Sequence, residues 1–408
     1  MRFILTILCT FSTLLSLAIG PDDVKTVQLY PTGNEVGLPI IGLQSGESLQ
    51  LEFDILGDDA PYLYYEIQHF SADWSEKDLN PLDFAKGFQT GNIDVFEFSF
   101  NTNQNYTHYE FSFPNDQLTL KVSGNYRVLV FEENADEPIL EERFFVTEQM
   151  AQIDAVIKNA VSGSQLDSHH QIDFLINTEA LPSNNPRQEF SAMVFQNFRM
   201  DNALSNLTPN RLNGNLLYFN NPFKYNMEAG NEFRWFNTRS VRYKTDGVAE
   251  IIRKNGRTDV WLIPALARQK AQFLVWDDFN GQFVVDHQEG NRPDIDGDYV
   301  YVHFTLKEEA AFKGKDVYVY GGLTNWEVND AYKLEMNNRQ NLLESVMYLK
   351  QGNYDYQFLV KEADGYSVKS TEGNFYRTEN QYTVLVYYKP FGARYDRLVG
   401  VRTLNSRF

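Results

Sequence analysis

Ser48-Leu49-Gln50-Leu51-Glu52-Phe53-Asp54-Ile55 alternates apolar and polar residues without a break. This period of two places Leu49, Leu51, Phe53 and Ile55 on one face, as in a strand buried on one side. Similar runs lie at 63–69, 109–113, 125–131 and 140–146, and turn-forming residues separate them. Roughly seven such strands in about 120 residues predict a β-sandwich of immunoglobulin-like size.

Two further blocks of alternating sequence follow, and longer, Asn-rich loops separate the strands of the first of them. In the last block, Gly321-Gly322-Leu323-Thr324-Asn325-Trp326 and the run 352–360 have the outline of the early-set sandwiches of glycogen- and starch-binding modules. We therefore predict an all-β fold with two to three consecutive β-sandwich domains, immunoglobulin-like or early-set-like, after a signal peptide. The predicted domains are 19–148, 149–292 and 293–408.

Residues 1–18 have the features of a secretory signal peptide. Arg2 supplies a positive charge, an apolar run broken only by Thr and Ser follows, and Ala18 ends a Ser-Leu-Ala cleavage signal. The single cysteine, Cys9, lies inside this segment, so the exported chain is expected to fold without disulfides. No later run reaches the roughly 18 apolar residues of a transmembrane helix, so none is expected.

The charge of the chain limits its partners. Its 408 residues carry a formal charge of −19, which repels nucleic acid, so nucleic-acid binding is not expected. Residues 231–270 are an exception, with nine basic and four acidic residues and a net charge of +5. Arg234, Arg239 and Arg242 in this segment are candidate contacts for an acidic partner. A solvated face with local ion pairs would explain the same composition.

An aromatic loop interrupts the first predicted sandwich. Asn80 can cap a helical turn in it, with Pro81 at the first helical position. Large aromatic residues on a loop either cover the core of their own domain or contact a partner, and both alternatives are open here. The candidate partner-binding residues are Trp74, Phe84 and Phe88.

Motifs for catalysis or metal binding do not emerge from the sequence. Nucleotide-binding glycine loops, His-Glu-x-x-His and Gly-x-Ser-x-Gly are all missing. His169 and His170 are adjacent, so on a strand they would point to opposite faces. Asp294-x-Asp296-Gly297-Asp298 lacks the spacing of a calcium loop and is interpreted as a polar linker. We expect no enzymatic activity, no cofactor and no metal.

Three stretches also resemble a known family. They are ADW…DLNP…GF over residues 72–88, then SFN…NYTHYEFSFPND, then SGNYRVLVFEEN…PILEERFFV. They are similar to the plug proteins of the type IX secretion system of Bacteroidota, most specifically over residues 24–146. The resemblance implies a non-catalytic periplasmic protein at the inner face of the outer membrane. Its expected partner is the large translocon barrel (SprA, also called Sov), whose periplasmic opening it would occlude.

The alternative function is a periplasmic or surface glycan-binding β-sandwich protein. It is based on the Gly321–Trp326 outline and predicts an exposed aromatic platform around Trp326. The alternative for Trp326 is a place in the core of an early-set sandwich.

Overall fold

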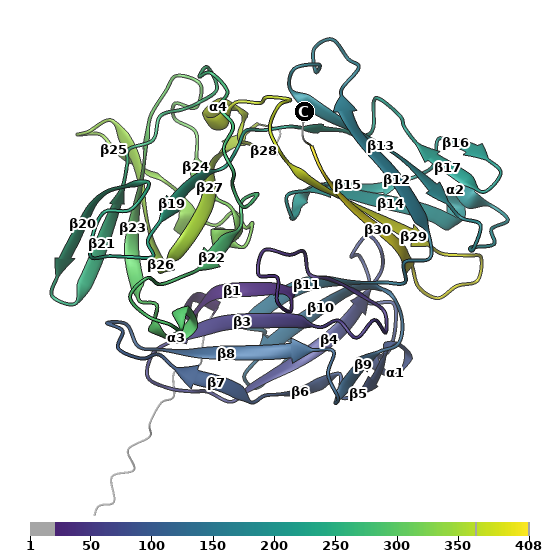
Figure 1. Ribbon diagram of the computed structural model, residues 1–408, viewed down its shortest axis with the longest axis horizontal. Coiled ribbons are helices and arrows are strands. Elements are labelled where there is room, and N and C mark those ends of the chain that lie inside the picture. Colours follow the sequence, from purple (N-terminus) through teal and green to yellow (C-terminus); the bar gives the residue numbers. More distant parts are fainter. Residues whose placement is uncertain (1–20, 364, 407–408) are drawn as a thin grey trace, which may run out of the picture.

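Three β-sandwiches make up the computed structural model, which describes residues 21–363 and 365–406 (Figure 1). The helices are single turns between strands, so the predicted all-β fold is confirmed. None of the helices in the described residues is long and apolar enough to cross a membrane. The predicted signal peptide, 1–18, lies outside the described residues. The helical turns are η1 (Pro21–Asp23), α1 (Pro81–Phe84), α2 (Pro186–Glu189), α3 (Pro293–Asp296), η2 (Gly322–Thr324), η3 (Asp330–Tyr332) and α4 (Lys369–Glu372).

The first sandwich packs two sheets and a short ribbon around one core. One sheet has the order β1 (Val24–Pro31), β3 (Leu49–Leu56), β8 (Tyr106–Phe113), β7 (Val95–Phe98). The other has the order β2 (Ile40–Gly42), β11 (Leu140–Thr147), β10 (Gly124–Phe131), β4 (Leu63–Phe70), β6 (Thr90–Ile93), and β5 (Ala85–Gly87) pairs with β9 (Leu118–Leu120). The apolar face of β3 lies in this core, as predicted. Gln50 and Asp54 on its polar face are also buried, and Lys350 of the third sandwich covers Asp54.

The second sandwich contains the last two strands of the chain. One sheet has the order β12 (Gln152–Asn159), β13 (His169–Asn177), β17 (Leu216–Phe219), β16 (Arg211–Asn213), and β18 (Asn226–Glu228) also pairs with β13. The other has the order β15 (Arg199–Leu207), β14 (Phe190–Gln196), β29 (Gln381–Tyr388), β30 (Arg397–Asn405). The core of this sandwich therefore joins residues 151–227 with residues 382–399.

The third sandwich is formed entirely between β18 and β29. One sheet has the order β19 (Arg234–Asn237), β27 (Gly352–Glu362), β22 (Phe283–Val285), and β24 (Val317–Tyr320) and β28 (Gly365–Ser367) also pair with β27. The other has the order β20 (Val248–Lys254), β21 (Arg257–Leu262), β23 (Tyr299–Lys307), β26 (Leu342–Lys350), β25 (Glu335–Asn337). The predicted limit between residues 292 and 293 differs from this pairing, because it separates strands of one sheet. Alternation identifies strands but does not specify their partners.

The first and second sandwiches meet through an apolar cluster. Phe145 of β11 stacks against Phe195 of β14 with ring centroids 6.1 Å apart, and Leu385 and Leu398 belong to the same cluster. At its border, the Tyr387 hydroxyl donates a 2.7 Å hydrogen bond to Asn125. The second and third sandwiches lie side by side above the first (Figure 1).

Candidate functional site

Trp74, a predicted partner anchor, lies at the contact between the first two sandwiches. Its ring packs against Phe70 and Phe145 at centroid distances of 5.8 and 5.6 Å, and the Arg143 guanidinium lies 4.8 Å from the ring centre. The backbone of Trp74 has φ +64°, in the left-handed region. The indole is partly buried and belongs to the apolar cluster around Phe145, so it joins two domains of the chain itself.

Of the other two predicted aromatic residues of this loop, one is buried in the core and one is exposed at the surface. The predicted helical turn forms as α1, with Pro81 at the first helical position, but the side chain of Asn80 at the N-cap makes no capping hydrogen bond. Phe84 ends the turn and is 1% exposed, with its ring 5.8 Å from that of Tyr126. Phe84 is therefore a core residue and is not available to a partner. Phe88 is 66% exposed and stays a candidate partner contact.

The arginines of the basic segment mainly form ion pairs within the third sandwich. Nε of Arg234 lies 3.0 Å from both carboxylate oxygens of Glu372, and Arg268 forms a 2.7 Å ion pair with the same group. Burial alone would raise the pKa of Glu372, but the two arginines hold it below its usual value. Arg239 pairs with Asp286 at 3.0 Å.

Arg242 is the open member of the predicted arginine set. Its side chain is 70% exposed, and its ion pair with the Glu289 carboxylate is long, at 3.8 Å. Local ion pairs, the second explanation offered for the composition of this segment, thus account for Arg234 and Arg239.

A row of exposed phenylalanines lies along β7 and just after it, at the edge of the first sandwich. All four residues of β7 are exposed, and the strand pairs with β8 on one side only among the described strands. Phe96 lies 6.0 Å from Phe98 and 5.6 Å from the buried Tyr109, and Phe98 and Phe100 are 53% and 69% exposed. We call Phe96, Phe98 and Phe100 the β7 aromatic row. The alternation in Phe96-Glu97-Phe98-Ser99-Phe100 is typical of a strand, but alternation does not show that the apolar face lies at an open edge.

The β7 aromatic row is held in place by the third sandwich. The N–H of Phe100 donates a 2.9 Å hydrogen bond to the carbonyl of Ile295, and Glu97 pairs with Arg292 at 2.6 Å. Figure 1 shows β5, β6 and β7 along the rim of the first sandwich that faces away from the second. Exposed apolar side chains on a fixed sheet edge are typical of a surface that binds another chain.

Buried polar residues join the first and third sandwiches behind this rim. Asp54 accepts hydrogen bonds from Nζ of Lys350 at 2.7 Å and from the Tyr299 hydroxyl at 2.6 Å. Its other oxygen lies 2.8 Å from Nδ1 of His108. Burial would raise the pKa of Asp54, but Lys350 and His108 hold it below its usual value. Such a network fixes the orientation of two domains, since each polar group loses its partner if they separate.

A large cavity of about 740 Å³ lies where the three sandwiches converge. Trp326 lines it, but the indole is partly buried and packs against Tyr320 and Phe233 with centroid distances of 5.4 and 6.0 Å. The predicted exposed platform around Trp326 is therefore wrong. The reason is local, because Trp326 follows a left-handed turn at Asn325 and lies against its own domain.

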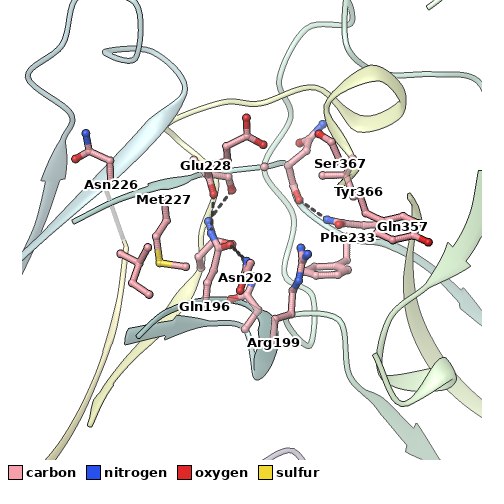
Figure 2. A pocket seen from close by; sticks show the side chains of 17 residues that line it. Gln196, Arg199, Asn202, Asn226, Met227, Glu228, Phe233, Gln357, Tyr366 and Ser367 are labelled. Atoms are coloured by element: carbon pink, nitrogen blue, oxygen red, sulfur yellow. Dashed lines mark hydrogen bonds between the residues drawn. The ribbon is translucent and has the colours of Figure 1, made fainter. Parts of the chain in front are cut away.

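A smaller cavity of about 240 Å³ separates the second and third sandwiches (Figure 2). Its polar side chains largely bond to one another. Gln196 donates to the carbonyl of Glu228 at 3.0 Å and accepts from Asn202 at 3.1 Å, while Gln357 donates to the carbonyl of Asn231 at 3.0 Å. These contacts lie within each domain and leave few groups directed at a ligand, while the Arg199 guanidinium of the second sandwich lies 5.2 Å from the centre of the Tyr320 ring of the third.

The remaining sequence candidates are structural. His170 is buried with its Nδ1 2.8 Å from the Tyr382 hydroxyl, and His169 is only partly buried beside Ser168. In the Asp294–Asp298 segment, Asp296 accepts from the N–H of Arg292 at 3.2 Å, and Asp298 accepts from that of Asn103 at 3.0 Å. These two carboxylates stabilise α3 and its contact with the first sandwich.

Comparison with known proteins relates this chain to one family and to one solved structure of the same fold. The model of the first domain of type 9 secretion system plug proteins matches residues 24–148. The crystal structure of a hypothetical protein from Parabacteroides merdae is 33% identical, with a TM-score of 0.91 over 95% of this chain and 98% of that chain. Dimeric latent PorU from Porphyromonas gingivalis is 9% identical, with a TM-score of 0.15 over 94% of this chain and 34% of that one, so the two folds differ. No curated protein matches. Residues 24–148, the first sandwich, therefore belong to the family of first domains of type 9 secretion system plug proteins.

Proposed function

We propose that this protein is a non-catalytic periplasmic plug that occludes the periplasmic opening of the large outer-membrane translocon barrel of the type IX secretion system, SprA or Sov. The main observation in support of this proposal is that contacts join the three sandwiches into one body. Each pair of sandwiches shares contacts, and the first sandwich, which the family model matches, lies against both others. A plug must fill a wide opening without deforming, and this arrangement supplies both bulk and rigidity.

The contacts between sandwiches are of the kind that resists deformation. The contact of the first and third sandwiches is centred on the buried Lys350–Asp54 pair, and that of the first and second is apolar with Arg397 paired to Glu148 at its border. Separating a buried ion pair leaves an uncompensated charge, which costs about 3–5 kcal/mol. The three sandwiches are therefore expected to move as one unit when the plug binds or leaves.

The surface of the first sandwich supports reversible binding to the barrel. Phe88 and the β7 aromatic row are exposed, whereas Phe84 and most of Trp74 are enclosed. A few aromatic anchors within a polar surface suit a partner that must also dissociate. We place the barrel contact on this rim, and Arg242 is the remaining open cation of the predicted set.

The test is an affinity purification of the tagged mature protein from its native outer membrane in mild detergent, analysed by mass spectrometry. We expect a very large barrel protein in near-equal amount. We also expect the purified plug to reduce the ion conductance of the barrel in a planar bilayer. A monomeric protein without a barrel partner, or a conductance that the plug leaves unchanged, would contradict the proposal. Retardation in a polysaccharide gel would instead favour the glycan-binding alternative.

A further inference from the structure

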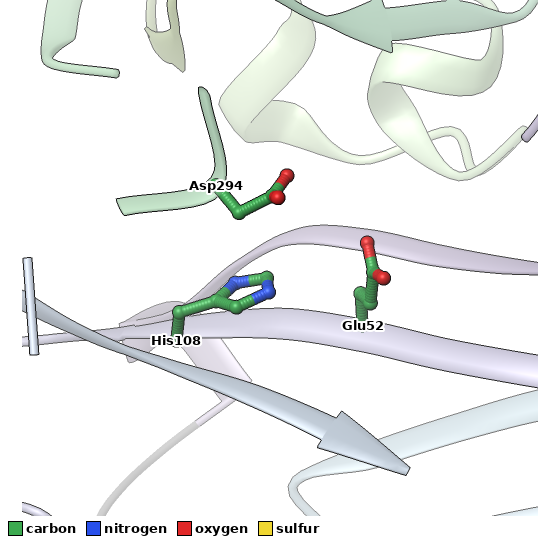
Figure 3. Close-up of side chains that lie close together, drawn as sticks. All are labelled: Glu52, His108 and Asp294. Atoms are coloured by element: carbon green, nitrogen blue, oxygen red, sulfur yellow. The ribbon is translucent and has the colours of Figure 1, made fainter. Parts of the chain in front are cut away.

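Three side chains with metal-binding chemistry meet between the first and third sandwiches (Figure 3). Glu52 projects from β3, His108 from β8 and Asp294 from α3. Each offers one donor atom, and the three donor atoms all lie within 4.8 Å of one another. The group therefore combines an imidazole and two carboxylates from two different domains.

His108 is oriented as a ligand would be. The residue is 5% exposed, and its Nδ1 lies 2.8 Å from the carboxylate of Asp54, which Lys350 and Tyr299 hold in turn. Its Nε2 is buried and has no hydrogen-bond partner among the described residues, and the Glu110 carboxylate lies 3.8 Å from it. Histidines that bind metals commonly donate their other N–H to a carboxylate in this way. A buried polar atom without a partner is costly, and a bound cation would satisfy it.

Lysine and arginine act on the two carboxylates only from beyond ion-pair distance, since Arg292 attracts Asp294 but itself pairs with Glu97. Neither Glu52 nor Asp294 forms an ion pair with lysine or arginine within residues 21–363 and 365–406. The hydroxyl of Tyr30 lies beside Glu52 and cannot neutralise its charge. Both side chains are partly buried, where solvent screens their mutual repulsion less well than at the surface. A divalent cation between them would balance this charge.

We propose that Glu52, His108 and Asp294 bind a divalent cation of the Zn²⁺ or Mn²⁺ class, which joins the first sandwich to the third. One imidazole and two carboxylates suit such ions, with water completing the coordination, whereas Ca²⁺ prefers oxygen ligands alone. Ligand distances of about 2.0–2.2 Å require only a small side-chain movement to close three donors on one ion. This inference goes beyond occlusion, because it makes the angle between two domains of the plug depend on metal.

The test uses the full mature chain with its affinity tag removed, stripped with EDTA and equilibrated with ZnCl₂ or MnCl₂. After desalting, mass spectrometry of the metal content is expected to give about one ion per chain. Added Zn²⁺ is expected to raise the Tm. His108→Gln and Asp294→Asn should each weaken binding by ~10-fold or more. Asp294→Asn keeps the main-chain oxygen that accepts from Lys350, so its fold should be preserved.

His303→Gln is the matched control, because His303 also pairs with an aspartate, Asp259 at 2.7 Å, but lies outside the proposed site. It should bind metal like the unmodified chain. Absence of stoichiometric Zn²⁺ and Mn²⁺ from the unmodified chain, or equal binding by all variants, would overturn the proposal. Binding that is lost in His108→Gln but intact in Asp294→Asn would place the ion within the first sandwich alone and overturn the bridging role.

Discussion

Nζ of Lys350 in the third sandwich lies 2.7 Å from Oδ2 of Asp54 in the first, and both side chains are 1% exposed. The two residues are 296 positions apart in the chain. Neither charge has access to water, so each depends on the other for compensation. The pair is thus a specific connection between two domains.

Replacing Lys350 with methionine should lower the free energy of unfolding by about 3–5 kcal/mol, because Asp54 would remain buried without its ammonium partner. Urea unfolding in the presence of EDTA measures this loss. Arg394→Met is the control, since Arg394 pairs with Asp83 at the surface, where solvent screens the interaction. Equal losses in the two variants would show that the buried pair has no special role.

Phe84 and Phe88 should respond differently to substitution by alanine. Phe84→Ala leaves a cavity beside Tyr126 and should cost about 3–5 kcal/mol of stability. Phe88→Ala should leave the Tm nearly unchanged, because the ring is exposed, and should reduce recovery of the barrel in affinity purification. A Phe88→Ala variant that copurifies with the barrel at the unmodified level would remove Phe88 from the proposed contact.

The differences between these neighbouring residues show what the sequence can predict. Alternation in 48–55 and the Asn80-Pro81 pair predicted a strand and a helical turn that both form, since these signals are local. The burial of Asp54 depends on Lys350, far away in the chain, and no local pattern indicates it. The pairing of β19 with β27 is equally non-local, and for this reason the limit at residues 292 and 293 did not match the strand pairing.

Glu372 should make the protein sensitive to acid. Its pKa in the folded state lies below the usual value of 4.5, despite burial, because Arg234 and Arg268 stabilise the charged form. Its stabilising contribution is therefore present above pH 4.5 and is lost as the pH falls through the folded pKa. Glu372→Gln should cost about 3–5 kcal/mol at neutral pH. Urea unfolding at pH 7, 5 and 3 should show that the difference in free energy of unfolding between Glu372→Gln and the unmodified protein becomes smaller as the pH falls. A difference that does not change with pH would contradict this.

Asp355 should produce the opposite pH dependence. Burial raises its pKa from 3.8 to about 8, and the nearby Asp278 adds to the shift. The folded state then binds the proton more tightly than the unfolded chain, so stability falls as the pH rises from about 4 to about 8. Asp355→Asn should flatten this part of the Tm profile, because an amide does not titrate. The fold should be retained, since the amide oxygen can still accept from the N–H groups of Phe279 and Gly281. Asp116→Asn, at an exposed position, should follow the unmodified profile.

The β7 aromatic row provides the sharpest test of where the plug binds. Phe98→Ser with Phe100→Ser should retain the fold, because both rings are exposed and the Phe100 N–H still donates to Ile295. If the rim contacts the barrel, removing two apolar anchors should reduce recovery of the barrel by tenfold or more, since about 1.4 kcal/mol corresponds to a factor of ten. Phe391→Ser is the control, because Phe391 is 99% exposed but lies in the second sandwich. Equal recovery with both sets of substitutions would place the contact elsewhere, whereas a selective loss would assign it to the open edge of the first sandwich.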